Sequence, residues 1–369
     1  MNYFSEKTNE LTPYVPGEQP QDGGYIKLNT NENPYNPSSK AIEAAKNFEF
    51  DKLRLYPDPE STRLREALAK KIGVSIDNIF VGNGSDEVLA IAFQTFFMNK
   101  ENVLMPDISY SFYPVYCKLY DVKVREVPLK KDYSININDY LIENNGIVIA
   151  NPNAPTGIGL SQEEIEKIVS YNKDSVVLID EAYVDFGGET VVSLIKKYNN
   201  LVVIRTLSKS YSLAGLRIGF AIGNEELING MNKVKNSFNS YPIDSISQTM
   251  AKEAIDDNEY FEKTRNMIIE TRERTKCELR KLGFEVLDSK TNFLFIQHKS
   301  AKAIDIFTYL KKNKILVRYF NKNRLENFLR VTIGTDKEME EFLRCISDFF
   351  NKGGWIEGNR KKKNKRGEY

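Results

Sequence analysis

Residues 205–219 read RTLSKSYSLAGLRIG and hold one lysine, Lys209, in a loop that is dense in hydroxyl groups. The apolar run at 201–204 predicts a buried strand that ends just before this loop. A buried lysine loses its charge readily, and its neutral amine is the nucleophile that forms an imine with an aldehyde. For Lys209 taken alone, a solvated loop lysine is the simpler interpretation. The neighbouring segments decide between this interpretation and an imine-forming lysine.

A second short apolar run, at 176–179, places Asp180 at the C-terminal end of another predicted strand. A carboxylate there can pair with the pyridinium nitrogen of pyridoxal phosphate, which keeps the ring protonated and makes it an electron sink. Tyr183, three residues further on, would lie within reach of the phenolic oxygen of that ring. The alternative is a helix that Asp180 caps, followed by a packed tyrosine.

A glycine-rich turn at 82–84 opens a predicted helix that is apolar along its first turns. Free N–H groups at a helix start form an anion site, where Ser85 and Asp86 would face a phosphate and Arg217 would balance its charge. An ordinary capped helix start is the alternative. The glycines do not match the dinucleotide-binding pattern, which argues against a nicotinamide dehydrogenase. No Walker sequence is present either.

A third apolar run, at 147–150, leads into the turn-forming residues 151–157. Three predicted strands therefore end in a polar or charged group, namely Asn153, Asp180 and Lys209. In open α/β sheets, ligands bind outside the carboxyl ends of the strands. We expect these three residues to meet at one site.

Together these segments resemble the fold-type-I aminotransferases that depend on pyridoxal phosphate. The resemblance covers about residues 11 to 350 and includes LTPY (11–14), LNTNENP (28–34), YPDP (56–59), NGSDE (83–87), SYSFY (109–113), DEAY (180–183), SK (208–209), LAGLRIG (213–219) and LRVTIG (329–334). Within the family, the chain looks most like members that act on histidinol phosphate. The resemblance implies transamination between L-histidinol phosphate and 2-oxoglutarate, a step of histidine biosynthesis.

The same resemblance implies an α/β domain plan. A large cofactor-binding domain at 31–242 would hold a mostly parallel seven-stranded sheet flanked by helices. A smaller α+β domain would follow at 243–352, with an N-terminal arm at 1–30. The basic residues 353–369 show no apolar pattern, and we expect them to form a disordered tail.

The cofactor site implied by the resemblance centres on Lys209, which would hold pyridoxal phosphate and shuttle the substrate proton. Asp180 would face the ring nitrogen and Tyr183 the ring oxygen. The remaining cofactor contacts would come from Ser85, Asp86, Tyr110, Asn153, Ser208, Arg217 and Tyr56. Of these, Tyr56 would reach into the neighbouring subunit, which implies a homodimer with shared active sites.

The substrate side of the implied site carries two arginines. Arg330 would bind the anionic group of the substrate, and Arg318 matches a second arginine of this kind, with Arg324 as a further candidate. Asn31 belongs to the same expected substrate set. Tyr14 would lie on an arm that closes over the substrate.

One position departs from the family pattern. The family has an asparagine directly before Pro-Thr-Gly, where it bonds the ring oxygen, but this chain has Ala154 there. Either Asn153 takes over this bond, or Tyr183 carries it alone. This departure bears on the pKa of the imine more than on whether the reaction occurs.

Bulk composition fits a soluble enzyme of two domains. The 369 residues are 41% hydrophobic and 28% charged, and no apolar stretch is long enough to predict a membrane span. A net charge of +1 argues against general nucleic-acid binding. Three scattered cysteines and a first segment without signal-peptide features indicate a cytoplasmic protein. The single histidine, His298, is expected at a strand end and not in a catalytic triad or metal site.

Several elements can be placed from local patterns. Prolines and glycines should keep residues 1–30 irregular, and strands should alternate with helices up to about residue 225. A helix at 161–172 should begin with a capping box of Ser161 and Glu164. A long helix, bent or interrupted, is expected at 243–281. Strands at 284–286, 293–296, 315–317 and 329–333 should then precede a closing helix at 338–350.

Three other functions stay open at this point. An aromatic amino acid aminotransferase would share the cofactor site, and Tyr14, Tyr113 and Tyr116 could line a pocket for either substrate class. A pyridoxal-phosphate decarboxylase acting on threonine phosphate would release carbon dioxide. A binding module that has kept the fold without activity is disfavoured by Lys209 and Asp180.

Overall fold

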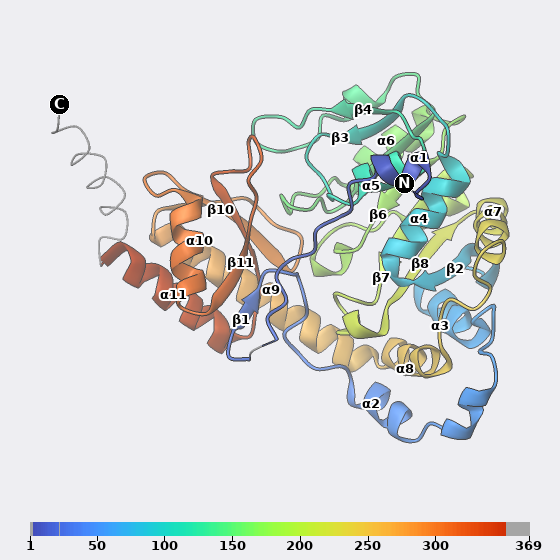
Figure 1. The fold of residues 1–369 in the computed structure, drawn as a ribbon, viewed down its shortest axis with the longest axis horizontal. Helices are drawn as coiled ribbons and strands as arrows, with labels where there is room; N and C mark the ends of the chain where they lie inside the picture. The colour runs from blue at the N-terminus through green and yellow to red at the C-terminus, as the bar shows by residue number, and fades with distance from the viewer. Residues whose placement is uncertain (1–2, 22, 352–369) are drawn as a thin grey trace.

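The computed structural model describes residues 3–21 and 23–351. The strands in this part of the chain form two sheets. The expected basic tail at 353–369 lies outside the described residues. Figure 1 shows the larger sheet with its helices on one side and the smaller sheet with α10 and α11 on the other. Within the described part, no helix combines the length and apolarity needed to span a bilayer.

The large sheet has the expected seven strands, in the order β2-β8-β7-β6-β5-β3-β4. Only β8 runs in the direction opposite to the other strands of this sheet. The strands are β2 (Ile79–Asn83), β3 (Val103–Pro106), β4 (Val124–Val127), β5 (Gly146–Ala150), β6 (Val177–Asp180), β7 (Leu201–Thr206) and β8 (Ile218–Gly223). The prediction of a mostly parallel sheet is confirmed.

Both faces of this sheet are buried, as the continuous apolar runs predict. Along β5, Ile147 and Ile149 pack into one core cluster and Val148 and Ala150 into another on the opposite face. The covering helices are α3 (Thr62–Ile72), α4 (Gly84–Phe96), α5 (Tyr113–Leu119), α6 (Gln162–Tyr171), α7 (Glu225–Asn236) and α8 (Ser245–Asp256). The short α2 (Ser39–Lys46) packs against α8.

The small domain has a five-stranded sheet in the order β1-β11-β12-β10-β9. Its strands are β1 (Ile26–Leu28), β9 (Phe284–Val286), β10 (Phe293–His298), β11 (Ile315–Tyr319) and β12 (Phe328–Thr332). Helices α10 (Ala303–Lys312) and α11 (Asp336–Asn351) complete it. All four strands expected here are present within a residue or two, and His298 ends β10 as expected.

The N-terminal arm is more regular than the sequence predicts. Ser5 caps a short helix, α1 (Glu6–Glu10), by accepting a bond from the Thr8 N–H at 3.2 Å. β1 pairs in parallel with β11, so residues 26–28 belong to the small sheet. The expectation of an irregular segment up to residue 30 was therefore wrong at β1, because a partner strand almost 290 residues away supplies its hydrogen bonds.

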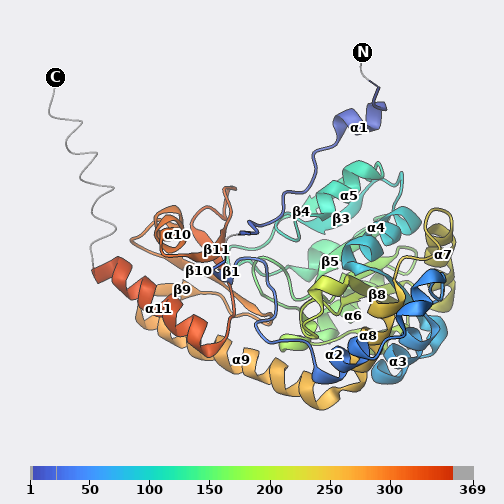
Figure 2. The ribbon, with the colours of Figure 1, turned by 60° about the horizontal axis from the view of Figure 1, so that its bottom comes forward.

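The long helix expected at 243–281 is divided at Asp257 into α8 and α9 (Asn258–Lys281). Asp257 has ψ of 65°, outside the helical region, and its carboxylate pairs with Lys40 at 3.1 Å. The break lets α8 pack on the large domain while α9 continues beneath both domains, as Figure 2 shows. The helix expected at 161–172 does begin with the predicted capping box of Ser161 and Glu164.

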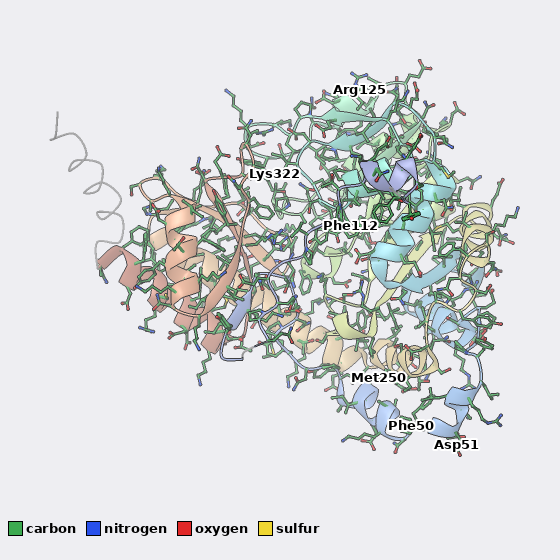
Figure 3. The ribbon with its side chains drawn as sticks, in the orientation of Figure 1. Phe50, Asp51, Phe112, Arg125, Met250 and Lys322 are labelled. Carbon is green, nitrogen blue, oxygen red and sulfur yellow. The ribbon has the colours of Figure 1, made fainter. Side chains whose placement is uncertain are left out.

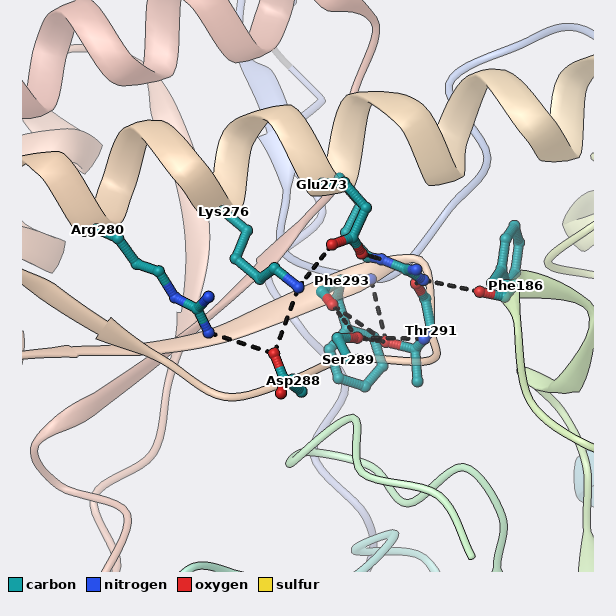
Figure 4. Close-up of polar contacts among 9 residues, drawn as sticks. Phe186, Glu273, Lys276, Arg280, Asp288, Ser289, Thr291 and Phe293 are labelled. Carbon is teal, nitrogen blue, oxygen red and sulfur yellow. Dashed lines mark hydrogen bonds and ion pairs between the residues drawn. The ribbon is translucent and has the colours of Figure 1, made fainter. Parts of the chain in front are cut away.

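Helix α9 also ties the two domains through polar contacts (Figure 4). Its buried Arg272 donates to the carbonyl of Phe186 in the large domain at 2.8 Å and to that of Thr291 in the small domain at 2.7 Å. Further along α9, Arg280 pairs with Asp288 at 3.2 Å. These contacts fix the start of β10 against the large domain.

Candidate active site

A cavity of about 390 Å³ lies between the two domains, outside the carboxyl ends of β5 and β6. Most of the sequence-predicted site residues line it; those that do not are Asn153, Tyr56, Arg324, Tyr113 and Tyr116. Parallel register explains part of this convergence, since Ala150 of β5 is aligned with Asp180 of β6, and Asp180 with Ile204 of β7. The expected meeting of strand ends therefore occurs for Asp180 and Lys209.

Asp180, the last residue of β6, is buried at the base of the cavity. Its two carboxylate oxygens accept bonds from the Ala182 N–H at 3.0 Å and the Tyr113 hydroxyl at 2.7 Å. Burial raises the pKa of Asp180 to about 6, although the Tyr113 bond opposes this shift. A proton-bearing ring nitrogen facing this carboxylate would restore its charged form.

Tyr113 is a functional residue whose role the sequence did not reveal. The hypothesis that it and Tyr116 line the pocket was wrong, because neither lines the cavity and both are buried. Tyr113 orients Asp180 instead, and Tyr116 donates to the carbonyl of Asp86 at 2.8 Å. Both come from α5, which is distant in sequence from its partners.

Lys209 stands in the loop after β7 with its amine in the cavity. Its Nζ lies 3.5 Å from the carbonyl of Thr30 and 5.9 Å from the centre of the Tyr183 ring. The loop is held from both sides. Asn33 donates to the Lys209 carbonyl at 2.9 Å, and the Ser208 N–H donates to the Thr206 hydroxyl at 3.1 Å.

The anion end of the cavity lies at the start of α4. Asp86 accepts from Arg217 at 3.0 Å and from the Tyr110 hydroxyl at 2.9 Å, so its side chain orients both neighbours. The free N–H groups of this first helical turn and the guanidinium of Arg217 remain as the anion-binding elements. A Cβ on Gly219 would collide with the backbone of Ser85, which shows how closely β8 approaches the helix start.

These residues fit pyridoxal phosphate, the cofactor expected from the sequence. A buried carboxylate, an amine and a helix start with an arginine stand around one cavity. The carboxylate suits the ring nitrogen of that cofactor, the amine suits its aldehyde, and the helix start with the arginine suits its phosphate. The Tyr110 ring lines the same cavity, as its expected stacking role requires.

Arg318 and Arg330 stand opposite each other on the neighbouring strands β11 and β12. Arg330 donates to the Asn29 carbonyl at 3.0 Å, and its Nε has no hydrogen-bond partner within the described structure. Burial lowers the pKa of Arg330, and the nearby Arg318 lowers it further. Two half-buried guanidinium groups that have no carboxylate partner among the described residues would favour an anionic ligand.

Asn31 and Tyr183 form one unit at the side of the cavity. The Asn31 amide donates to the Tyr183 hydroxyl at 2.8 Å, and its carbonyl oxygen accepts from Thr332 at 3.0 Å. Asn31 is thus occupied with orienting Tyr183. Tyr14 reaches the cavity from the arm and stacks on Phe112, with ring centres 4.8 Å apart.

Ala154 lines the cavity, whereas Asn153 does not. The Asn153 amide donates to the Ile108 carbonyl at 3.0 Å, and its oxygen accepts from Ser109 at 2.8 Å. With its amide occupied in this way, Asn153 is poorly placed to bond a ring oxygen. The geometry favours Tyr183 for that role.

Two further predicted residues lie outside the cavity. Tyr56 is 83% exposed and stacks on Tyr241, with ring centres 4.7 Å apart, so it makes no contact with the site of its own chain. Arg324, a candidate for substrate binding, does not line the cavity because its guanidinium contacts Asp107 and two main-chain carbonyls.

The fold and the site define a pyridoxal-phosphate-dependent transferase, and comparison with known families agrees. Residues 24–346 match the model of the class I and II aminotransferases, and the chain belongs to that family. The expected enzyme class, fold and cofactor are thereby confirmed.

Several individual proteins are similar to the chain over most of its length. The chain is 54% identical to a histidinol-phosphate aminotransferase of Clostridium botulinum over 95% of its length and 99% of the relative. A histidinol-phosphate aminotransferase of Sinorhizobium meliloti, solved in complex with pyridoxal-5'-phosphate, matches with a TM-score of 0.85, 22% identity and coverage of 95% and 99%. An L-threonine-O-3-phosphate decarboxylase of Porphyromonas gingivalis matches with a TM-score of 0.75, 24% identity and coverage of 88% and 99%. The fold alone thus does not separate transferase from lyase.

Proposed function

We propose that this chain transfers the amino group of L-histidinol phosphate to 2-oxoglutarate, giving imidazole acetol phosphate and L-glutamate. The observation that carries the proposal is the pair Arg318 and Arg330, which faces the same cavity as Lys209 and Asp180. The similarity to histidinol-phosphate aminotransferases over nearly the whole chain supports the choice of substrate. The reaction would take place in the cytoplasm, as a step of histidine biosynthesis.

The residues divide the work of this reaction. Bound pyridoxal phosphate supplies an aldehyde that takes up the amino group and a ring that accepts electrons. Lys209 would take the proton from the substrate Cα on its Nζ and carry it during the transfer. Asp180 would face the ring nitrogen and keep it protonated, and Tyr113 fixes the orientation of Asp180.

Arg330 would serve both substrates in turn. L-glutamate and 2-oxoglutarate present a carboxylate to its guanidinium, and histidinol phosphate, which has no carboxylate, presents its phosphate. We expect Arg330→Ala to slow both half-reactions at low substrate concentration, by about 10-fold or more, since a charge-assisted pair contributes roughly 1.5–3 kcal/mol. An unchanged glutamate half-reaction would contradict the shared use of this arginine.

The enzyme would act as a homodimer with shared sites. Exposed apolar side chains gather on two segments that the stacked rings of Tyr56 and Tyr241 join. They are Phe50, Leu53, Leu55, Tyr56, Phe238 and Tyr241. Figure 3 places Phe50 at the outer edge of the large domain. A rimmed apolar patch of this kind is typical of a protein interface, and a partner chain would carry Tyr56 towards the cofactor phosphate.

Product analysis tests the proposed function against its alternatives. Purified protein with pyridoxal phosphate, L-histidinol phosphate and 2-oxoglutarate should form L-glutamate in proportion to the donor consumed. L-phenylalanine as donor should give a much lower kcat/KM. Preference for phenylalanine would point to an aromatic aminotransferase, and carbon dioxide release from threonine phosphate to a decarboxylase.

A further inference from the structure

The loop between β11 and β12 crosses from the small domain to the large one. Figure 3 shows Lys322 of this loop at the junction of the two domains. Two residues on, Arg324 donates to the Asp107 carboxylate at 2.9 Å and to the carbonyls of Leu129 and Lys130 at 3.0 and 2.9 Å. One side chain of the small domain therefore makes three polar contacts with the large domain.

The large domain contacts the same residue in return. The Tyr133 hydroxyl donates to the Arg324 carbonyl at 2.7 Å, and the guanidinium lies 5.4 Å from the centre of the Tyr133 ring. That ring packs edge-on against Phe328 of β12, with centres 5.2 Å apart. Arg324 also adopts φ of 67°, a left-handed conformation that bends the loop towards the large domain. Such a conformation persists only where its surroundings hold it in place.

Asp107 connects this contact to the cofactor side. One of its carboxylate oxygens accepts from Arg324, and the other accepts from the Leu129 N–H at 2.9 Å. Asp107 directly follows β3 and stands three residues before Tyr110, whose ring lines the cavity. The ion pair with Arg324 thus holds Asp107 close to the residue that is expected to stack on the cofactor.

The loop held by Arg324 joins the two strands that carry the anion-binding arginines. Arg318 is the last residue but one of β11, and Arg330 is the middle residue of β12. Lys209 and Asp180 belong to the large domain. The distance between the anion of a substrate and its reacting carbon is fixed, so these two sets of residues need a defined separation.

We propose that Arg324 is a positioning residue, whose contacts with Asp107, Leu129, Lys130 and Tyr133 set the separation between Arg318 and Arg330 on one side and Lys209 on the other. Arg324 itself touches no substrate in this account. The inference rests on the proposed function for the identity of the amino donor, but it applies equally to the glutamate half-reaction.

Asp107→Asn distinguishes this role from direct substrate binding by Arg324. Loss of the ion pair should raise KM for both L-histidinol phosphate and L-glutamate by about 5- to 10-fold, with kcat changed less than about 3-fold. Arg324→Met should do the same, and the double variant should be no worse than Arg324→Met alone. If Arg324 bound the substrate anion, Asp107→Asn would leave KM unchanged or lower it, and that result would overturn the proposal.

Arg125→Met is the matched control, because it removes an exposed arginine of β4 in the same domain as Asp107. It should leave both KM values unchanged. Tyr133→Phe, a milder change that removes one hydroxyl, should raise KM less than Asp107→Asn does. It provides a second test if the other variants fold poorly.

Hydrogen exchange in the cofactor-free protein gives a readout that is independent of turnover. Amides at 129–134 and 320–327 should exchange faster in Asp107→Asn and Arg324→Met than in the wild type or in Arg125→Met. Faster exchange with unchanged KM would show a contact that only stabilises the loop, and the proposal would fail. If histidinol phosphate proves not to be the donor, the glutamate half-reaction still tests Arg324, so the two failures are distinguishable.

Discussion

At the scale of single residues, the site is built from groups whose chemistry is visible in the sequence and partners that are not. Lys209, Asp180 and Arg217 each follow a local pattern, and the structure places all three around one cavity. Tyr113 could not be predicted to orient Asp180, because the two are 67 residues apart and meet only through packing of α5. Asn153 and Arg324 have the residue types of ligands, but the structure gives their polar atoms other partners.

The buried Asp180 should make the stability of the cofactor-free protein depend on pH. Its pKa rises from 3.8 to about 6 in the fold, so the folded state holds its proton more tightly than the unfolded chain. The free energy of unfolding should therefore fall as pH rises from about 4 to 6, by roughly 2–3 kcal/mol at 1.36 kcal/mol per pKa unit. Urea unfolding at a series of pH values measures this.

Asp180→Asn is the comparison for that experiment. The variant should lack this loss and become more stable than the wild type above about pH 6. A fall of similar size up to about pH 7 should remain in both proteins, because burial raises the pKa of Glu181 from 4.5 to about 7. Parallel curves for variant and wild type would contradict the assignment of the raised pKa to Asp180.

Lys209→Ala should abolish turnover while leaving the fold intact. The amine is part-buried and makes one long hydrogen bond, so its loss should change the free energy of unfolding by less than about 1 kcal/mol. Removal of the group that moves the proton should lower the rate by about 10³-fold or more. Steady-state glutamate formation and thermal unfolding measure the two effects, and a near-normal rate would refute the assigned role.

At the scale of elements, sequence patterns predicted those helices and strands that depend on residues close together in the chain. The capping box of Ser161 and Glu164 is present at the start of α6, and the apolar runs form the buried strands of the large sheet. β1 could not be predicted, because three residues form a strand only when β11 provides the partner. The break at Asp257 depends likewise on α8 packing on one domain and α9 extending to the other.

The close contact between β8 and the start of α4 gives a prediction at the scale of elements. Gly219→Ala would place a Cβ against the backbone of Ser85, so the helix start that forms the anion site must move. We expect the free energy of unfolding to fall by about 1–3 kcal/mol and the affinity for pyridoxal phosphate to fall with it. Gly215→Ala is the control, since a Cβ there meets no atom within 4 Å. Equal stability of the two variants in urea unfolding would contradict this account.

At the scale of the whole molecule, the active site lies between two domains and depends on how they are held together. The two-domain plan was expected from the resemblance to the family, but the contacts that fix the domains could not be predicted. Arg272 of α9 and Arg324 of the loop after β11 both donate to main-chain carbonyls of the large domain, and carbonyl partners have no sequence signature. Tyr56 is exposed and lies outside the cavity of its own chain, so its proposed role depends on a second subunit.

Hybrid dimers test whether Tyr56 serves the neighbouring subunit. Lys209→Ala subunits paired with Tyr56→Phe subunits should contain one site with both wild-type residues, if sites are shared. At a cofactor concentration too low to fill the Tyr56→Phe sites, the hybrid should be active although neither parent is. An inactive hybrid would place Tyr56 in the site of its own chain. A Tyr56→Phe parent that is fully active at this cofactor concentration would remove Tyr56 from the site altogether.

We propose that this cavity binds pyridoxal phosphate and accepts an amino group from L-histidinol phosphate. The most direct test is the absorbance spectrum of the cofactor-loaded protein, recorded before and after L-histidinol phosphate is added, with L-phenylalanine in a parallel sample. We predict a visible band of the bound cofactor that histidinol phosphate removes at low concentration and phenylalanine removes only weakly. Loss of the band with phenylalanine alone would contradict the substrate assignment, and absence of any such band would contradict the cofactor site.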